Sequence, residues 1–389
     1  MWLSLAVASL ALWLLVLLLP WRPWTSAPFL RAGAPDDRAD LSGVTVLIPA
    51  RNEAAHLRES LRCVVEQGAW KSVVVVDDQS DDDTAKIARE VLGRRGEVLT
   101  GEPLPDGWSG KLWALQQAAR HADSPWVLLL DADIALRPGI ATAALRIARK
   151  NGADLVSLMA TPAMTGFWDR LLMPAFVYFF KLLYPFRLAN SRLSRISAAA
   201  GGFLLLRAEA LDAIGGFASL RDALIDDCTL AARVKRAGHR TWIGLSRDVI
   251  SLRPCRRFGA IREMVARTAY TQLRDSVMLL VVCTGVMGLA FVVPVAAIIA
   301  GSPAVRVAGG GAWIVMGITY LPVLRFYALP VLWAMTLPVA GVFYLEMTWA
   351  SAVRSWYGRR ASWRGRTYSS RQDAVNRSES GRVEKVSDR

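Results

Sequence analysis

Apolar residues follow two different patterns along the chain. Residues 1–21 carry no charged side chain, and neither do three later segments, 277–305, 307–324 and 326–345. Segments of this length can cross a bilayer as helices. Between 43 and 270, short apolar runs alternate instead with polar segments. The pattern predicts a globular domain between an N-terminal transmembrane anchor at 1–21 and a C-terminal transmembrane region at 277–350.

Basic residues after the first apolar segment indicate its orientation. Arg22, Arg31 and Arg38 follow it in a linker at 22–42, whereas a signal peptide carries basic residues before its apolar run. By the positive-inside rule, we expect an uncleaved anchor whose C-terminal side faces the cytoplasm. The arginine-rich tail at 354–389, which we expect to be disordered, also favours the cytoplasm.

The C-terminal membrane region does not fit this orientation in a simple way. A cytoplasmic domain and a cytoplasmic tail require an even number of passes between them, but the region offers three candidate segments. Pro322, Pro330 and Pro338 interrupt these segments and indicate that one of them is broken or re-entrant. Two passes and three passes both stay open.

The middle of the chain is predicted to form an α/β sheet. Apolar runs at 44–48, 72–76 and 126–130 have the length of buried strands, and helix-like segments lie between them. Such alternation is typical of a parallel, Rossmann-like sheet, in which ligands bind at the carboxyl ends of the strands. Polar motifs follow all three runs, so we expect these motifs to meet at one edge.

The segment 171–188 is strongly apolar but is interrupted by Pro174, Lys181 and Pro185. These residues make it a poor transmembrane span. Two alternatives stay open for it: a helix that lies in the membrane surface, with nearby arginines close to lipid phosphates, and a helix buried in the core.

Two carboxylates follow the run at 126–130. Alternation along an extended chain would put Asp131 and Asp133 on one side, with Ala132 facing away. Carboxylate oxygens at a strand end can hold Mg²⁺ or Mn²⁺, which then binds phosphate oxygens. An Asp-x-Asp triplet can equally close a strand and open a turn, so its context decides.

Charge and composition narrow the partners. A net charge of +14 is compatible with binding to nucleic acid, to anionic lipid or to a phosphorylated substrate. The basic residues are spread along the chain and form no nucleic-acid motif, so we expect lipid and phosphate partners and no nucleic acid. The four cysteines match no metal or disulfide spacing and indicate a reducing compartment.

Five motifs in fixed order carry a family resemblance. They are Pro49-Ala-Arg-Asn-Glu53, the acidic segment 77–84, Gly107-Trp-Ser-Gly-Lys-Leu-Trp-Ala114, Asp131-Ala-Asp133 and Asp226-Asp-Cys-Thr-Leu230. In this order, over 43–270, they resemble family 2 glycosyltransferases of the GT-A fold, the nucleotide-diphospho-sugar transferases. The motif at 107–114 and the stretch 267–273 are most similar to bacterial hopanoid-biosynthesis-associated members.

The resemblance implies roles for individual residues. In the family, residues at several of the motif positions border the nucleotide or recognise it. Lys111 falls where a contact to the nucleotide or to its phosphates is expected. Asp133 would hold the metal that bridges the diphosphate, and Asp131 would lie nearer the ribose or sugar. The remaining donor-binding positions implied are Ala50, Glu53, Asp77 and Asp78.

Asp227, with Asp226 beside it, matches the catalytic base of the family. A hydroxyl is a poor nucleophile near neutral pH, so a carboxylate must accept its proton as the new bond forms. A single displacement needs one base and inverts the anomeric centre. One motif departs from the family: Gln-x-x-Arg-Trp is reduced to Arg267 followed by Thr268, so Arg267 is a weaker candidate for diphosphate contact. The alternatives are the nearby basic residues Arg253, Arg256 and Arg257.

The sequence therefore predicts an inverting, metal-dependent glycosyltransferase in the bacterial inner membrane, with its catalytic domain facing the cytoplasm. The donor would be a nucleotide sugar, UDP-linked by resemblance, and the acceptor a membrane lipid hydroxyl such as that of a hopanoid. A processive polysaccharide synthase and a catalytically silent membrane scaffold are the alternatives.

Overall fold

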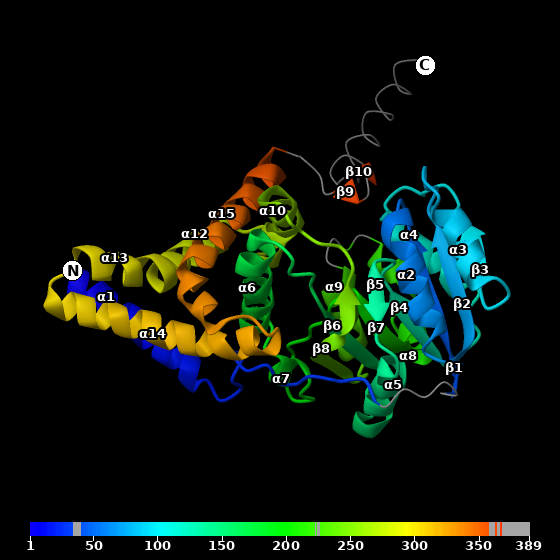
Figure 1. Ribbon diagram of the computed structural model, residues 1–389, viewed down its shortest axis with the longest axis horizontal. Helices are drawn as coiled ribbons and strands as arrows, with labels where there is room; N and C mark the ends of the chain where they lie inside the picture. Colours follow the sequence, from blue (N-terminus) through cyan, green and yellow to red (C-terminus); the bar gives the residue numbers. More distant parts are fainter. Residues whose placement is uncertain (34–39, 222, 224–225, 358–361, 364–365, 368–389) are drawn as a thin grey trace, which may run out of the picture.

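An eight-stranded sheet forms the centre of the globular part in the computed structural model, which describes residues 1–33, 40–221, 223, 226–357, 362–363 and 366–367 (Figure 1). The strand order is β3-β2-β1-β4-β7-β6-β8-β5. The strands are β1 (Asp40–Ala50), β2 (Ala69–Asp77), β3 (Glu97–Thr100), β4 (Trp126–Leu130), β5 (Ile134–Leu136), β6 (Leu155–Thr161), β7 (Phe203–Arg207) and β8 (Thr241–Ser251).

The sheet is mixed, whereas the sequence pattern predicted a parallel one. Strands β3, β2, β1 and β4 are parallel to one another, as expected. Strand β7 runs antiparallel to both of its neighbours, β4 and β6, and β5 runs antiparallel to β8. An apolar run of four or five residues reveals burial but not direction, so the pattern could not distinguish the two arrangements.

Alternate strand residues face two separate helical layers. Val46 and Ile48 pack with α2 (Ala54–Val65), α3 (Thr84–Leu92) and α5 (Ile140–Asn151). Leu47, between them, faces the opposite layer, because successive side chains of a strand point to opposite faces. That layer contains α4 (Gly110–Ala119), α8 (Ala208–Ala213), η1 (Phe217–Leu220) and α9 (Asp226–Arg236).

Apolar helices extend from one side of this domain. Three are long enough to cross a membrane, Val277–Ala300, Pro303–Phe326 and Val331–Trp356, and the N-terminal apolar helix Trp2–Leu18 is shorter. This confirms the predicted α/β domain with an N-terminal and up to three C-terminal apolar helices. In element labels they are α1 (Trp2–Leu18), α12 (Val277–Met287), η2 (Gly288–Val292), α13 (Val293–Ala300), α14 (Pro303–Phe326), η3 (Val331–Thr336) and α15 (Leu337–Trp356).

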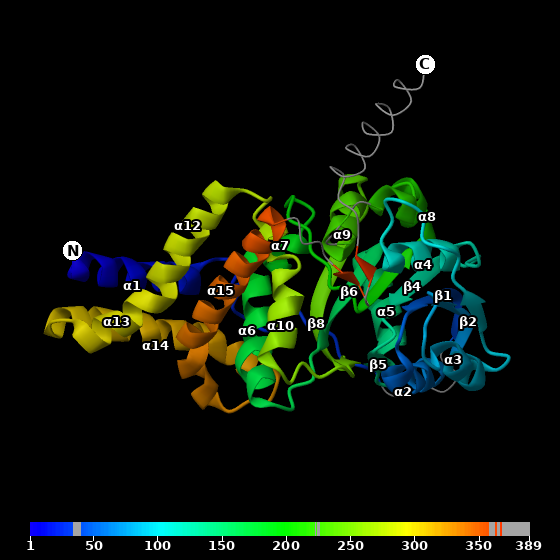
Figure 2. The ribbon, with the colours of Figure 1, turned by 90° about the horizontal axis from the view of Figure 1, so that it is seen from above.

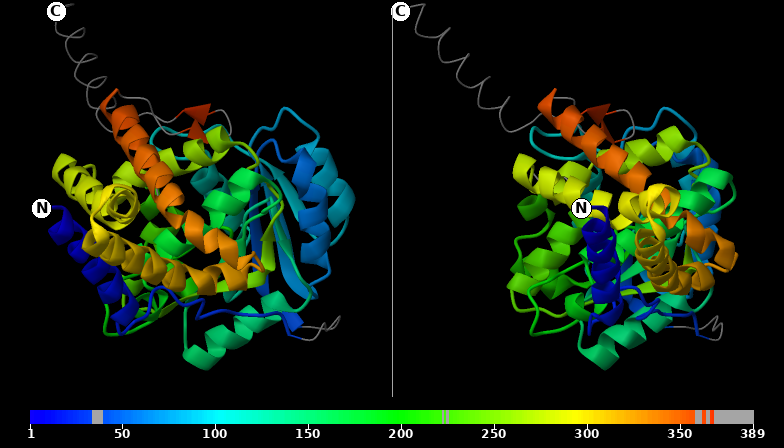
Figure 3. Two further views of the ribbon diagram at one scale, coloured as in Figure 1. Left: turned by 60° about the vertical axis from the view of Figure 1, so that its left-hand side comes forward. Right: turned by 90° about the vertical axis from the view of Figure 1, so that its left-hand side faces the viewer.

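The apolar helices have two directions. Helices α1 and α14 lie side by side along the long axis of the molecule (Figures 1 and 3). Helices α6 (Phe167–Leu183), α10 (Phe258–Ala266) and α15 run across that axis, between α1–α14 and the sheet (Figures 1 and 2). We call these three the transverse layer. The Tyr344 hydroxyl joins two of them by donating to the Leu172 carbonyl at 2.9 Å, and Arg262 pairs with Glu346.

The transverse layer accounts for the segment 171–188. Helix α6 ends at Leu183 and is followed by α7 (Phe186–Ala189). One face of α6 packs on α14 and α15, and Val177 packs with Ile243 and Leu245 of the sheet. Its burial corresponds to the core-helix alternative, while its position beside the apolar helices is also the one that an interfacial helix would occupy.

Lys181 is a buried basic residue of α6. Its side chain is 1% exposed, and its ammonium donates to the carbonyls of Thr25 and Ala27 in the linker. It also lies 5.0 Å from the Phe186 ring centroid. Burial lowers the pKa of Lys181 to about 7. Lys181 therefore ties the N-terminal linker to the transverse layer at some cost in desolvation.

We predict that stability rises with pH because of Lys181. Between pH 7 and its ordinary value of 10.5 the unfolded lysine keeps a proton that the folded one releases, so the free energy of unfolding increases by at most about 1.4 kcal/mol per pH unit. The thermal midpoint of the full chain should therefore rise from pH 7 to 9 relative to that of Lys181→Met. The exposed control Lys150→Met should keep the wild-type profile, and parallel wild-type and Lys181→Met profiles would contradict the assignment.

Candidate active site

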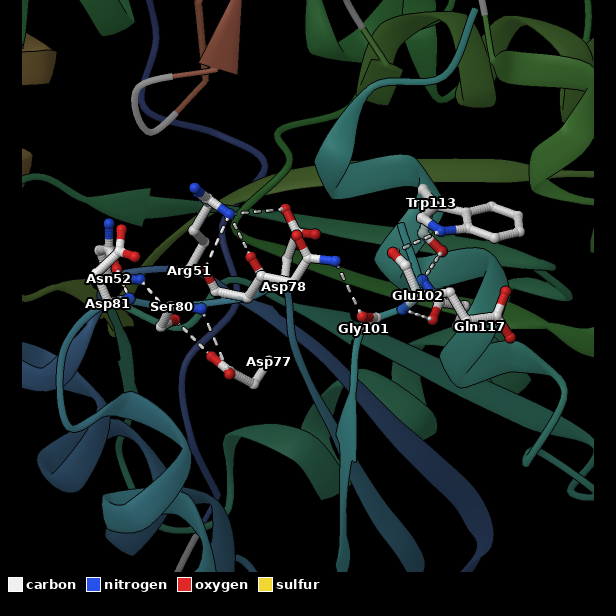
Figure 4. Close-up of polar contacts among 11 residues, drawn as sticks. Arg51, Asn52, Asp77, Asp78, Ser80, Asp81, Gly101, Glu102, Trp113 and Gln117 are labelled. Carbon is white, nitrogen blue, oxygen red and sulfur yellow. Dashed lines mark hydrogen bonds and ion pairs between the residues drawn. The ribbon is translucent and has the colours of Figure 1, made fainter. Parts of the chain in front are cut away.

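Loops after β1 and β2 bring the first two motifs together (Figure 4). Asp78 is fully buried, and its backbone N–H donates to the Ala50 carbonyl at 2.8 Å. The Arg51 guanidinium lies 3.9 Å from the Asp78 carboxylate and donates to the Gln79 carbonyl at 3.1 Å. Asp78 is therefore held at the strand end by both backbone and charge, as a ligand-reading residue requires.

Asp77 has a different position from Asp78. Its carboxylate accepts from the Ser80 hydroxyl and, at 3.4 Å, from the Ser80 N–H (Figure 4). The side chain that accepts from the start of α3 is Asp82, whose carboxylate binds the Thr84 N–H at 3.0 Å. Asp77 thus shapes the turn that carries Asp78, and neither residue caps the helix.

The two loops are also bound to each other. The Asn52 N–H donates to the Ser80 hydroxyl at 2.9 Å, and the Asp81 N–H donates to the Asn52 amide oxygen at 2.9 Å (Figure 4). Asn52 and Gln79 have φ values of +52° and +54°, in the left-handed region that non-glycine residues rarely adopt. Strained backbone held by such contacts is found at ligand-binding loops.

The end of β3 extends this edge toward α4. The Gly101 N–H donates to the Asp77 carbonyl at 2.8 Å, and a Cβ on Gly101 would lie 3.0 Å from that oxygen. Next to it, the Glu102 N–H donates to the Gln117 amide oxygen at 2.8 Å, and Trp113 donates to the Glu102 carbonyl (Figure 4). These contacts fix α4 against the strand ends.

Lys111, Asp131 and Asp227 meet at a second position. Ser109 caps α4 and puts Lys111 in its first turn, where its ammonium lies 2.7 Å from the Asp131 carboxylate. A Cβ on Gly201 would lie 3.3 Å from the Lys111 ammonium and 3.4 Å from an Asp227 oxygen. Lys111, Asp131 and Asp227 line one small cavity of about 20 Å³ with Gly201. A side chain at position 201 would therefore press on the ends of Lys111 and Asp227.

Asp133 forms a separate cluster with Arg253. After β4 the chain turns, and the antiparallel pair β5–β8 returns Arg253 to within 2.9 Å of the Asp133 carboxylate. The same guanidinium pairs with Glu53, which is 5% exposed. Asp131 and Asp133 therefore have different cationic partners, although Ala132 between them points into the core as predicted.

The Asp131 and Asp133 carboxylates are suited to a divalent ion that is also coordinated by phosphate oxygens of a substrate. Among the described residues no group of three or more His, Cys, Asp or Glu side chains is arranged around a metal position. Mg²⁺ in enzymes is commonly held by one or two carboxylates together with substrate phosphates, and Mn²⁺ takes similar oxygen ligands. Asp133 and Asp131, whose side chains are 18% and 34% exposed, fit that type of site.

Tyr184, which follows α6, lies near Asp227 and is paired with Gln272. The Tyr184 hydroxyl donates to the Gln272 amide oxygen. Burial raises the pKa of Tyr184 to about 12, with Cys228 and Asp227 adding negative charge nearby. Sequence reasoning missed both residues. The sequence signal that could have identified Gln272 is the segment Gln272-Leu-Arg274, which carries glutamine and arginine at a spacing different from that of the family motif.

The other predicted residues take simpler places. Asp226 opens α9. Ala50 ends β1 and is fully buried, so it contributes backbone rather than a side chain. Arg267 is exposed at the C-terminal end of α10, and none of the contacts described for the two clusters includes it. Arg253, which the sequence offered as one alternative among nearby arginines, occupies the position between carboxylates instead.

Residues 45–215 match the glycosyl transferase family 2 model. These residues contain the second half of β1, the strands β2 to β7, and all of the clustered side chains except Asp227, Arg253 and Gln272. They form a family 2 glycosyltransferase domain.

Curated relatives of the domain act on a carotenoid acid by name. A segment of 93 residues is 36% identical to the 4,4'-diaponeurosporenoate glycosyltransferase of Staphylococcus haemolyticus, and one of 92 residues is 34% identical to that of Staphylococcus aureus. The first match covers 24% of this chain and 24% of the relative, and the second covers 23% and 24%. The chain thus spans about a quarter of the length of these relatives, and a hopanoid acceptor stays a prediction.

A solved structure shares the fold over nearly the whole chain. A mannosyltransferase from Pyrobaculum calidifontis, solved with GDP-Man and Mn²⁺, superposes with a TM-score of 0.57 at 23% identity, covering 92% of this chain and 100% of that one. The likeness supports the GT-A type of the glycosyltransferase domain and extends to the helices beyond it.

We predict that Arg253→Gln destabilises the domain. The change leaves the Glu53 and Asp133 carboxylates without their cation, and such loss costs about 1–3 kcal/mol. The measurement is chemical unfolding of the full chain at pH 7. Arg257→Gln, an exposed neighbour with the same charge change, is the control; equal stability of the two variants would contradict the prediction.

Proposed function

We propose that the chain transfers a sugar from a nucleoside-diphosphate donor to a membrane lipid at the cytoplasmic face of the bacterial inner membrane, with inversion and with Mg²⁺ or Mn²⁺. The observation that carries the proposal is the meeting of Lys111, Asp131 and Asp227 at one cavity beside the strand ends. Sugar transfer needs such a position, because the residues that bind the donor and the residue that activates the acceptor must lie close to one another.

The donor would occupy the edge formed by the ends of β1, β2 and β4. Buried Asp78 is suited to accept hydrogen bonds from the base or ribose, and Arg51, Lys111 and Arg253 supply positive charge along the same edge. By resemblance the base is uracil. Asp133 and Asp131 would hold the divalent ion, which when bound would neutralise charge on the leaving diphosphate.

Asp227 would act as general base toward the acceptor hydroxyl. Its carboxylate faces the cavity at the first turn of α9, and its other oxygen accepts from the Cys228 N–H at 2.7 Å. Tyr184, which stays protonated at neutral pH, would donate a hydrogen bond on the acceptor side. A single base beside a single donor site supports direct displacement.

The helix directions support an arrangement in the membrane. If α1, α12–α13 and α14 cross the bilayer along the long axis, the turn between α13 and α14 lies on the side away from the domain (Figure 1). The segment Val331–Trp356 then stays at the cytoplasmic surface, because Trp333 packs on Phe167 and Trp356 packs on Tyr270. This arrangement, with two C-terminal passes, would leave the domain and the residues that follow α15 on one side, as the basic tail favours.

The acceptor class has two candidates. A lipid hydroxyl, such as that of a hopanoid, follows from the resemblance of the sequence. The curated relatives are named for a carboxylate acceptor instead. An ionised carboxylate needs no base, so the two candidates differ in how strongly transfer depends on Asp227. A processive polysaccharide synthase would be distinguished by polymeric products, and a silent scaffold by absence of donor binding.

We predict that Asp227→Asn lowers kcat about 10²–10⁴-fold toward a hydroxyl acceptor, because the proton loses its acceptor in the transition state. Donor affinity, measured by titration calorimetry with the full chain in nanodiscs, should stay unchanged. Asp212→Asn on α8 is the exposed control. A fully active Asp227→Asn enzyme with a hydroxyl acceptor would refute the base assignment, whereas retained activity confined to carboxylate acceptors would identify the second class.

We also predict a metal dependence centred on Asp133. Chelation should abolish transfer, and Asp133→Asn should raise the Mn²⁺ concentration for half-maximal rate about 10-fold or more, since one carboxylate ligand is lost. Electron paramagnetic resonance of Mn²⁺ bound with nucleoside diphosphate gives a readout independent of turnover. The surface variant Asp123→Asn should behave as wild type, and an unchanged Mn²⁺ requirement in Asp133→Asn would exclude the assignment.

A further inference from the structure

A cavity away from the active site lies where the apolar helices meet the domain. It has a volume of about 370 Å³, within the range of small-ligand sites. Its walls come from the linker after α1, from β8 and from the end of α14. The lining residues are Ser26, Phe29, Arg31, Arg247, Pro322, Arg325 and Phe326.

Three arginines of this cavity have no acidic counterpart in the part of the chain that the structure describes. No Asp or Glu oxygen there lies within 4.0 Å of a guanidinium nitrogen of Arg31, Arg247 or Arg325. Asp248, the next residue after Arg247, is turned to other partners: it accepts from the Ala32 N–H at 2.7 Å and lies 3.7 Å from Arg137. Within the described residues, the positive charge of the cavity is therefore not balanced by an ion pair.

The arginines are held in place by aromatic rings and backbone. The Arg247 guanidinium stacks over the Phe326 ring at 4.9 Å and donates to the Arg325 carbonyl at 2.8 Å. Arg31 lies over the Phe29 ring at 5.7 Å, and the two rings are 6.1 Å apart. Cation–π contacts of this kind orient guanidinium groups while leaving their N–H donors available.

The wall from the linker is fixed to the sheet. Phe29 forms a parallel bridge with Leu245 of β8, and hydrogen bonds of 2.9 and 3.0 Å join Leu30 and Pro28 to the same residue. The cavity is thus built between a sheet edge and a helix end rather than formed by a loose terminus.

We infer that this cavity binds the phosphate headgroup of an anionic phospholipid. Guanidinium groups match phosphate oxygens in charge and geometry, and basic pockets at the cytoplasmic ends of membrane helices suit lipid headgroups. Arg325 and Phe326 end the apolar helix α14, and the half-exposed Phe29 can meet the upper acyl chain. The inference uses the membrane orientation proposed above but does not depend on the glycosyl transfer.

The test compares lipids with and without net charge on the purified full chain. Native mass spectrometry in neutral detergent measures binding of phosphatidylglycerol and phosphatidylcholine to wild type, to Arg247→Gln/Arg325→Gln and to Arg94→Gln/Arg95→Gln. The last pair is exposed in the turn between α3 and β3, remote from the apolar helices, and removes the same charge. Thermal midpoints check folding, and Arg31→Gln on the linker is a milder second variant.

We expect wild type and the control pair to prefer phosphatidylglycerol about 10-fold or more, and the cavity pair to lose this preference; Arg31→Gln should weaken it. Glycerol 3-phosphate separates lipid from free phosphate, since a lipid site loses most of its affinity without acyl chains. The inference is overturned if the preference is absent, if it survives in the cavity pair, or if glycerol 3-phosphate binds as tightly as the lipid.

Discussion

Ion pairing between carboxylates and three basic side chains stabilises the edge of the sheet at which we propose that the donor binds. Arg51, Lys111 and Arg253 each neutralise an aspartate at a strand end or in the turn after it. Without these cations, the carboxylates of the edge would repel one another in a partly buried setting, and loops with left-handed residues would have little to stabilise them. Much of the local geometry follows from this compensation.

The same pairing would prepare the edge for the proposed anionic donor. With a diphosphate bound, the basic side chains would exchange carboxylates for phosphate oxygens, and Asp131 and Asp133 would then be available to hold a divalent ion. The net charge of the edge changes little through this exchange. Preorganised charge of this kind lowers the cost of reorganisation on binding.

The sequence predicted the strands that precede the motifs because buried runs of Val, Ile and Leu have a clear pattern. It also singled out Asp78 and Asp131 after strands and Lys111 and Asp227 at helix starts, and the structure brings the last three residues to one cavity. It did not predict the antiparallel β7, whose direction depends on the long excursion through α6, nor the pairing of Arg253 with Asp133, which joins residues 120 positions apart. Tyr184 and Gln272 were not predicted as site residues for the same reason, since tertiary packing alone brings them near Asp227.

The short pairing of the linker with β8 has a mechanical consequence. Because Phe29 and Leu245 are bridged, only about ten residues separate the end of α1 at Leu18 from the sheet, and Lys181 clamps the middle of that stretch. These contacts restrict the movement of α1 relative to the sheet. In the proposed membrane orientation, the Asp227 carboxylate would then keep a constant height above the lipid surface, and encounters with a lipid substrate would be governed by lateral diffusion in the bilayer.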